Sequence, residues 1–260
     1  MNEACRQIRR DLLAVAYHSG NGHLPTCFSV VEMIYAAYGV MKHDPANPKW
    51  EQRDLFILSK GHAALALYSV LGELGYFPPE DVFTLGRKGS IFGCHPDRTK
   101  IPGIEASTGS LGHGIGLAAG MALAFKIQKS ERRVFTLIGD GESNEGSVWE
   151  AVMVAAHQKL SNLTILYDDN RSHARGLPIE NPAERFRAFG CEVLEVDGHD
   201  VSALKAACAG RGETVRVVVA RTVKGHGCKT LVDNVYEWHR RSPNDAEMPL
   251  LLEELNAQPV

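Results

Sequence analysis

Two stretches of sequence, read together, decide the fold of this protein. Residues 133–142 are RVFTLIGDGE, and residues 162–170 are NLTILYDDN. Each contains a continuous apolar run, which is typical of strands covered on both faces, and residues 147–158 between them have helical spacing. We therefore predict two neighbouring parallel strands joined by one helical crossover.

The rest of the chain extends this alternation of strands and helices. Further strands are predicted at residues 54–59, 191–196 and 215–220, and helices at residues 1–19, 29–40, 63–72, 115–128, 201–209 and 248–255. This order predicts an α/β fold, with a doubly wound, mostly parallel sheet flanked by helices. We expect residues 1–260 to form a single domain with an irregular tail from about Lys224.

Two features of the middle of the chain add to this prediction. Residues 86–112 are rich in Gly, Pro, Ser and Thr and predict a long loop, which in a compact domain usually serves function. The helix at 115–128 is rich in Ala and Gly, and we expect it to be buried.

Composition excludes several classes of protein. The 260 residues carry 28 Lys and Arg against 31 Asp and Glu, and this balance argues against nucleic-acid binding. No apolar run approaches the ~20 residues that a membrane span needs. The first 20 residues lack a signal-peptide pattern, and none of the six cysteines is spaced C-x-x-C. We expect a cytoplasmic protein.

Polar residues follow both strands of the central unit. Asp140 ends the first and Asn170 ends the second, so one crossover brings them to the same edge of the sheet. A carboxylate and an amide oxygen suit Mg²⁺, and Gly139 and Gly141 let backbone amides approach a phosphate. A simple Gly-Asp-Gly turn, or a metal-dependent phosphate binder of another class, would share this pattern.

Together with other segments, this pattern resembles a known family. Gly139-Asp140-Gly141 followed by Asn170 is similar to the thiamine-diphosphate binding motif. Between about Ile8 and Pro243 the chain resembles the N-terminal part of transketolases, in particular the short form encoded as a separate subunit. The matching segments are HDPANP at 43–48, RD at 53–54, LSKGHA at 58–63, GCHP at 93–96, STGSLGHG at 107–114, GDGE at 139–142, WEA at 149–151, VDGHD at 196–200, TVKG at 222–225 and WH at 238–239.

The resemblance implies cofactor-binding roles for individual residues. Asp140 and Asn170 would bind Mg²⁺, with the backbone carbonyl of Ser172 as a third ligand. His62 and Gly141 would contact the diphosphate. The remaining cofactor-binding residues implied are Gly109, Ser110, Leu111, Gly139 and Glu142, of which the first three would lie against the middle and the pyrimidine ring of thiamine diphosphate.

The resemblance also implies catalytic residues. His23, His62, His95 and His239 would line the substrate channel, where histidines titrating near neutrality suit proton transfer on sugar hydroxyls. We assign no chemistry to the remaining histidines considered, which are His18, His43, His157 and His199. Glu145 and Glu150 match carboxylates that the family places near the interface between two active sites.

The function implied is transfer of a two-carbon ketol unit from a ketose, or ketose phosphate, to an aldose. The glutamate that activates the cofactor in this family lies on a pyrimidine-binding domain, for which this chain has no room. We therefore expect an α2β2 assembly with a C-terminal partner subunit.

Three alternative functions remain. They are a non-catalytic or regulatory paralogue, a deoxyxylulose-phosphate synthase-like subunit, and the α subunit of a 2-oxo acid dehydrogenase, against which the histidines argue.

Four departures from the family pattern bear on the sugar substrate. Residues 24–28 (LPTCF) follow His23 where small residues are usual, and we expect them to form a loop that reshapes the donor pocket. His113 stands where Gln is common, residues 172–175 differ from the family, and Arg240 replaces a usual Gly. These changes favour a pathway-specific transketolase.

Overall fold

A single parallel sheet organises the chain. The computed structural model describes residues 1–259, except for the side chains of Ala174 and Arg175. Within these residues five strands, all parallel, lie in the order β1-β2-β3-β5-β4. Their bounds are β1 Leu55–Leu58, β2 Val134–Gly139, β3 Leu163–Asp169, β4 Glu192–Asp197 and β5 Arg216–Arg221. The five predicted strands and the doubly wound fold are confirmed.

Helices connect the strands. The α-helices of the described residues are α1 Glu3–Ser19, α2 Leu24–Tyr38, α3 Ala64–Glu73, α4 Gly114–Ile127, α5 Gly146–His157, α6 Pro182–Ala188, α7 Val201–Ala209, α8 Lys229–Asp233 and α9 Glu247–Asn256. The sequence did not predict α6 or α8, which are only seven and five residues long. Such short helices carry too few turns for a periodic apolar pattern.

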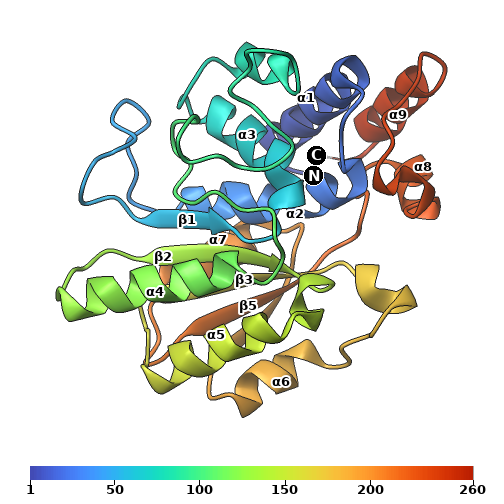
Figure 1. Ribbon diagram of the computed structural model, residues 1–260. Helices are drawn as coiled ribbons and strands as arrows, with labels where there is room; N and C mark the ends of the chain where they lie inside the picture. The colour runs from blue at the N-terminus through green and yellow to red at the C-terminus, as the bar shows by residue number, and fades with distance from the viewer. Residues whose placement is uncertain (260) are drawn as a thin grey trace.

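Alternate side chains of each strand enter two different cores. On β2, Phe135 and Leu137 pack into the core beneath α1, α2, α3 and α7, whereas Val134 and Ile138 pack into the core beneath α4, α5 and α6. Figure 1 shows these two groups of helices on opposite faces of the sheet. Both faces of β1, β2, β3 and β5 are covered, so these strands are mostly apolar rather than alternating, whereas the edge strand β4 (EVLEVD) is only partly buried.

The segment after His23 corrects one prediction. Residues 24–28 form the first turns of α2 and not a loop, and Pro25 stands at the helix start, where its missing N–H is not needed. Leu24 and Phe28 are fully buried in the core. Their bulk therefore faces the core, and of these five residues only Thr26 lines the cavity described below.

The exposure of α4 corrects the prediction that the helix at 115–128 is buried. Ile115, Ala118 and Ala122 are buried against the sheet, but Gly116, Leu117 and Gly120 are exposed on the opposite side. The small residues therefore occupy the outer face as well as the inner one. A composition rich in Ala and Gly does not distinguish a helix buried all round from one with a bare outer face.

The helices also bear on membrane association. Among the described residues, no helix combines the length and the apolar character needed to cross a lipid bilayer.

Candidate active site

A cavity of about 840 Å³ opens at the carboxyl edge of the sheet. It is lined by segments that follow β1, β2, β3 and β5, by the start of α2, by the long loop 86–112 and by the turn Glu237–His239. Ligands of parallel α/β sheets bind at this edge, and the volume falls in the usual range for a small-molecule site.

Most of the residues implied by the family resemblance meet at this cavity. They are His23, His62, His95, Gly109, Leu111, Gly139, Asp140, Gly141, Glu142, Ser172 and His239. Ser110 and Asn170 do not line it. Ser110 is exposed, and Asn170 is buried.

Asp140 is a buried carboxylate at the cavity wall. Its Oδ1 accepts hydrogen bonds from the backbone N–H of Gly141 at 2.6 Å and from the Ser172 hydroxyl at 2.5 Å. Its Oδ2 lies 2.9 Å from Nδ1 of His173, at an angle that leaves this nitrogen without a hydrogen bond. Within the described part of the chain it has no Lys or Arg partner, although it is 1% exposed. A buried carboxylate of this kind favours a bound cation.

Asn170 is held by a second acidic residue. Its amide nitrogen donates to Asp168 at 2.6 Å, and its Oδ1 accepts from the backbone N–H of Ser172 at 3.0 Å. Asp168 also accepts from the ammonium of Lys60 and from the Ser29 hydroxyl. This network fixes the Asn170 amide while its Oδ1 retains a second lone pair for another partner.

Glu142 lines the cavity but serves mainly to join its walls. Its carboxylate accepts from the Ser59 hydroxyl at 2.5 Å, from Gly112 N–H at 2.9 Å and from Gly139 N–H at 3.2 Å. Burial raises the pKa of this carboxyl, opposed by these hydrogen bonds. Glu142 thus ties the ends of β1 and β2 to the loop before α4.

Three of the predicted histidines are clustered. The ring of His23 lies 5.4 Å from that of His62 and 5.4 Å from that of His239, measured between centroids. Burial, followed by nearby positive groups, lowers the pKa of His62 to about 2 and that of His23 to about 4, and it also lowers the pKa of His239. These rings are therefore uncharged at neutral pH, contrary to our expectation that they titrate near neutrality. A bound anion would raise these values.

Two lysines of the cavity were not predicted as site residues. Lys60 is paired with Asp168, whereas Lys224 has no hydrogen-bond or ion-pair partner within the described residues. Burial and repulsion by Lys60 lower the pKa of Lys224. Both lie inside segments that carried the family resemblance, LSKGHA and TVKG, so position within a matched motif was the available signal.

The residues present fit a magnesium diphosphate. Among the described residues no three His, Cys, Asp or Glu side chains could hold a metal by themselves, so a cation here requires mixed oxygen ligands. Asp140 and Asn170 supply the carboxylate and amide oxygens that Mg²⁺ accepts, and phosphate oxygens complete its shell. Lys224 lines the cavity and forms no ion pair with any described residue, so its ammonium suits the phosphates.

Comparisons with known proteins agree with this geometry. A family profile described as "Transketolase, thiamine diphosphate binding domain" matches residues 2–255. A 6-deoxy-6-sulfo-D-fructose transketolase subunit from Clostridium sp. (strain MSTE9) is 40% identical over 80% of this chain and 79% of that protein. An apulose-4-phosphate transketolase subunit from Actinobacillus succinogenes is 36% identical over 98% of this chain and 95% of that protein.

Solved structures show the same fold. A transketolase variant from Pichia stipitis superimposes with a TM-score of 0.89 at 28% identity, and transketolase from Campylobacter jejuni with a TM-score of 0.87 at 28% identity. These matches cover 99% and 98% of this chain, which spans 42% of the length of each of those chains. The chain therefore belongs to the transketolase family and has the fold of its thiamine diphosphate binding domain.

Proposed function

We propose that this chain holds thiamine diphosphate and Mg²⁺ in the cavity and catalyses two-carbon ketol transfer between sugars or sugar phosphates as one subunit of a two-chain transketolase. One observation carries the proposal. His23, His62, His95 and His239, from four separate segments, line the same cavity as the buried carboxylate of Asp140. The two relatives described above are both named as transketolase subunits, which supports the division into two chains.

The residues proposed to bind the diphosphate and Mg²⁺ lie at the carboxyl ends of the strands. Asp140, Asn170 and the backbone carbonyl of Ser172 would bind Mg²⁺, and the amides near Gly139 and Gly141, with His62, would face the diphosphate. The loop residues Gly109, Ser110 and Leu111 would lie against the rest of the cofactor. Bound thiamine diphosphate supplies the electron sink that allows the bond between C2 and C3 of a ketose to break.

We assign proton transfer to the histidines that line the cavity. An uncharged imidazole has one nitrogen that accepts a proton and one N–H that donates a hydrogen bond. His23, His62 and His239 lie close enough to act on neighbouring hydroxyls of one sugar, and His95 lines the same cavity. One of these rings would accept the single proton that the C3 hydroxyl of the donor loses as the C2–C3 bond breaks and return it to the carbonyl oxygen of the acceptor aldehyde, while the others donate or accept hydrogen bonds that orient the sugar.

A partner subunit would complete the active site. We propose that residues 1–260 act as one diphosphate-binding unit and that a second chain carries the pyrimidine-binding domain and its activating glutamate, in an α2β2 assembly. The relative from Actinobacillus succinogenes, which is itself named as a transketolase subunit, has 95% of its length matched by this chain. A protein of this length that forms one part of a transketolase supports the same arrangement here.

The requirement for a partner is directly testable. We expect the purified chain, supplied with Mg²⁺, thiamine diphosphate, a ketose phosphate and an aldose, to turn over at least roughly 10²- to 10⁴-fold more slowly than its complex with the partner, because an essential acid is missing. The assay measures the new ketose by mass spectrometry after mixing the chain with a co-purified partner. Full activity of the chain alone would refute the two-subunit proposal, and activity only with pyruvate as donor would favour the deoxyxylulose-phosphate synthase alternative.

Arg240 is expected to select anionic donors. It lines the cavity, is exposed at its mouth, and makes no hydrogen bond or ion pair with any described residue. The neighbouring Arg241, by contrast, pairs with Glu247 and stacks on Trp238. We expect R240G to raise the KM of the complex for a phosphorylated ketose by about tenfold, since charge-assisted hydrogen bonds contribute that much, and to leave an unphosphorylated donor unaffected.

The matched control for this prediction is R241A, which removes a guanidinium that is already paired. Its effect should be equal for the two donors. If R240G altered both donors equally, the guanidinium would not be contacting the donor's anionic group.

A further inference from the structure

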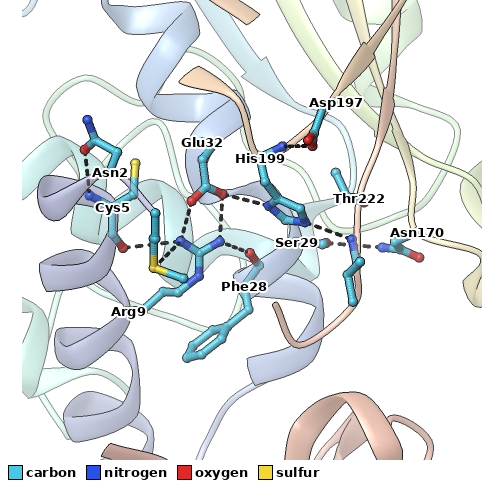
Figure 2. Close-up of polar contacts among 12 residues, drawn as sticks. Asn2, Cys5, Arg9, Phe28, Ser29, Glu32, Asn170, Asp197, His199 and Thr222 are labelled. Atoms are coloured by element: carbon cyan, nitrogen blue, oxygen red, sulfur yellow. Dashed lines mark hydrogen bonds and ion pairs between the residues drawn. The ribbon is translucent and has the colours of Figure 1, made fainter. Parts of the chain in front are cut away.

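A buried polar network extends from α1 to the segment that follows β5. Arg9 of α1 donates to both carboxylate oxygens of Glu32 on α2, at 2.5 and 2.7 Å, and to the backbone carbonyl of Phe28 at 2.6 Å. Both side chains are 0–1% exposed. Figure 2 shows Glu32 between Arg9 on one side and His199 on the other. The catalytic roles proposed above use none of these residues.

His199 continues the network toward the cavity. Its Nδ1 lies 3.2 Å from Oε2 of Glu32, and its Nε2 lies 2.9 Å from the backbone nitrogen of Val223. Burial alone would raise the pKa of Glu32, but Arg9 and His199 hold it at about 2, so the carboxylate only accepts hydrogen bonds. Because Val223 N–H only donates, the imidazole carries its proton on Nδ1 and accepts at Nε2.

A second histidine covers this ring. His226 stacks on His199 with the centroids 3.5 Å apart and the planes 10° from parallel. Burial and the neighbouring His199 lower the pKa of His226 to about 3. An uncharged His226 can stack on an uncharged His199 without repulsion. The stack therefore limits the ring of His199 to one orientation.

The segment held by His199 carries the unpaired lysine of the cavity. The Thr222 hydroxyl donates to Asp168, Val223 N–H donates to His199, and Gly225 N–H donates to the carbonyl of Pro25 at 2.9 Å. Lys224 lies between these anchors and forms no hydrogen bond or ion pair with a described residue, although the charges of Asp140 and Asp168 partly oppose the lowering of its pKa by burial and Lys60. Of the three anchors, His199 is the one that joins this segment to the Arg9–Glu32 pair.

We propose that His199 is a positioning residue for Lys224: by accepting the Val223 N–H, it aims the Lys224 ammonium at the diphosphate group that binds in the cavity. This inference rests on the proposed function, which places a diphosphate there. His199 itself touches neither cofactor nor substrate. A backbone hydrogen bond one residue away restricts the lysine backbone, so less conformational freedom is lost when its ammonium meets the phosphates.

Two substitutions separate positioning from mere packing. The carboxamide of Gln reaches the place of the imidazole Nε2, so H199Q can still accept from Val223 N–H. The shorter carboxamide of Asn reaches only the place of Nδ1, so H199N can still donate to Glu32 but loses Val223. Each variant keeps one of the two hydrogen bonds, and thermal unfolding of both variants checks that they are similarly stable.

The experiment measures cofactor binding by the complex with the partner subunit. In H199N we expect the apparent KM for thiamine diphosphate to rise about tenfold, while kcat at saturating cofactor stays within about twofold of the wild type. H199Q should restore most of the affinity. K224M alone should weaken binding by roughly 10- to 100-fold, and adding H199N to K224M should have no further effect.

The outcomes are decisive for the positioning role. Equal losses in H199N and H199Q, or an H199N effect that persists at full size in the K224M background, would overturn it. Calorimetric titration of the same variants with magnesium pyrophosphate gives a reading that does not depend on turnover. A wild-type complex that shows no dependence on thiamine diphosphate would instead refute the proposed function itself.

Discussion

Replacing Asp140 with asparagine is expected to lower the kcat of the assembled enzyme by about 10²- to 10³-fold, the loss typical of removing one preorganised electrostatic contact. The substitution keeps the size of the side chain, and its oxygen can still accept from Gly141 N–H and the Ser172 hydroxyl. What it removes is the buried negative charge that would hold Mg²⁺. The measurement is steady-state turnover of the complex at saturating thiamine diphosphate, over a range of Mg²⁺ concentrations.

The control for D140N is D169N. Asp169 is also a carboxylate at the end of a central strand, but it lines a different, smaller cavity and lies 3.2 Å from Nε of Arg171. Its substitution should leave kcat within a few-fold of the wild type. Equal losses in D140N and D169N would indicate general damage to this edge of the sheet rather than loss of a metal ligand, and an active D140N would refute the metal site.

Replacing Arg9 with methionine should produce the largest loss of stability, a decrease of about 3–5 kcal/mol in the free energy of unfolding at pH 7. Methionine fills much of the space but leaves the Glu32 carboxylate buried with His199 as its remaining partner. It also leaves the Phe28 carbonyl without its donor. Urea-induced unfolding followed by circular dichroism measures the change, with the slope of the transition compared between variants.

The neighbouring Arg10 provides the control. Its guanidinium is partly exposed and donates to Asn256 and Glu3, so R10A should cost less than about 1 kcal/mol. The two variants should also differ in their response to pH. In R9M, burial dominates and raises the folded-state pKa of Glu32 above its usual 4.5, so lowering the pH from 7 toward 5 should recover part of the lost stability. In the wild type this pKa is held at about 2, so the Glu32 contribution is retained over that range. A loss in R9M no larger than that in R10A would contradict the importance of the buried pair.

The strands were predictable because they are buried on both faces. Val134–Gly139 and Leu163–Asp169 lie between two layers of helices, so most of their positions before the carboxyl ends are apolar and each apolar run stands out from its surroundings. Because the carboxyl ends of neighbouring parallel strands lie at the same edge of a sheet, the predicted strands also placed Asp140 and Asn170 at that edge. The helices α6 and α8 were not predicted because they are too short to show a periodic apolar pattern.

The start of α2 shows where local pattern was misleading. Residues 24–28 contain a proline and follow a Gly-rich turn, which suggested a loop. The helix forms because Pro25 occupies its first turn and because burial of Leu24 and Phe28 in the core stabilises it. This packing could not be predicted from the local sequence of residues 24–28.

His199 is a similar case. Its segment, VDGHD at 196–200, was one of those that carried the family resemblance, but we assigned His199 itself no chemistry. The tertiary structure brings it between Glu32 and Val223, which are 167 and 24 residues away. The role that we propose for His199 depends on these contacts between distant segments.

The sequence by itself determined the parallel sheet, the family, the histidines and the carboxylate of the site, because each depends on a local apolar run or on a short motif. Only the tertiary structure decided which side chains share the cavity, that Lys224 lines it without an ion pair to any described residue, and that three of the histidines are uncharged at neutral pH. The reason is physical. Burial and charge neighbours set pKa values and ion pairing, and these arise from contacts between residues far apart in the chain.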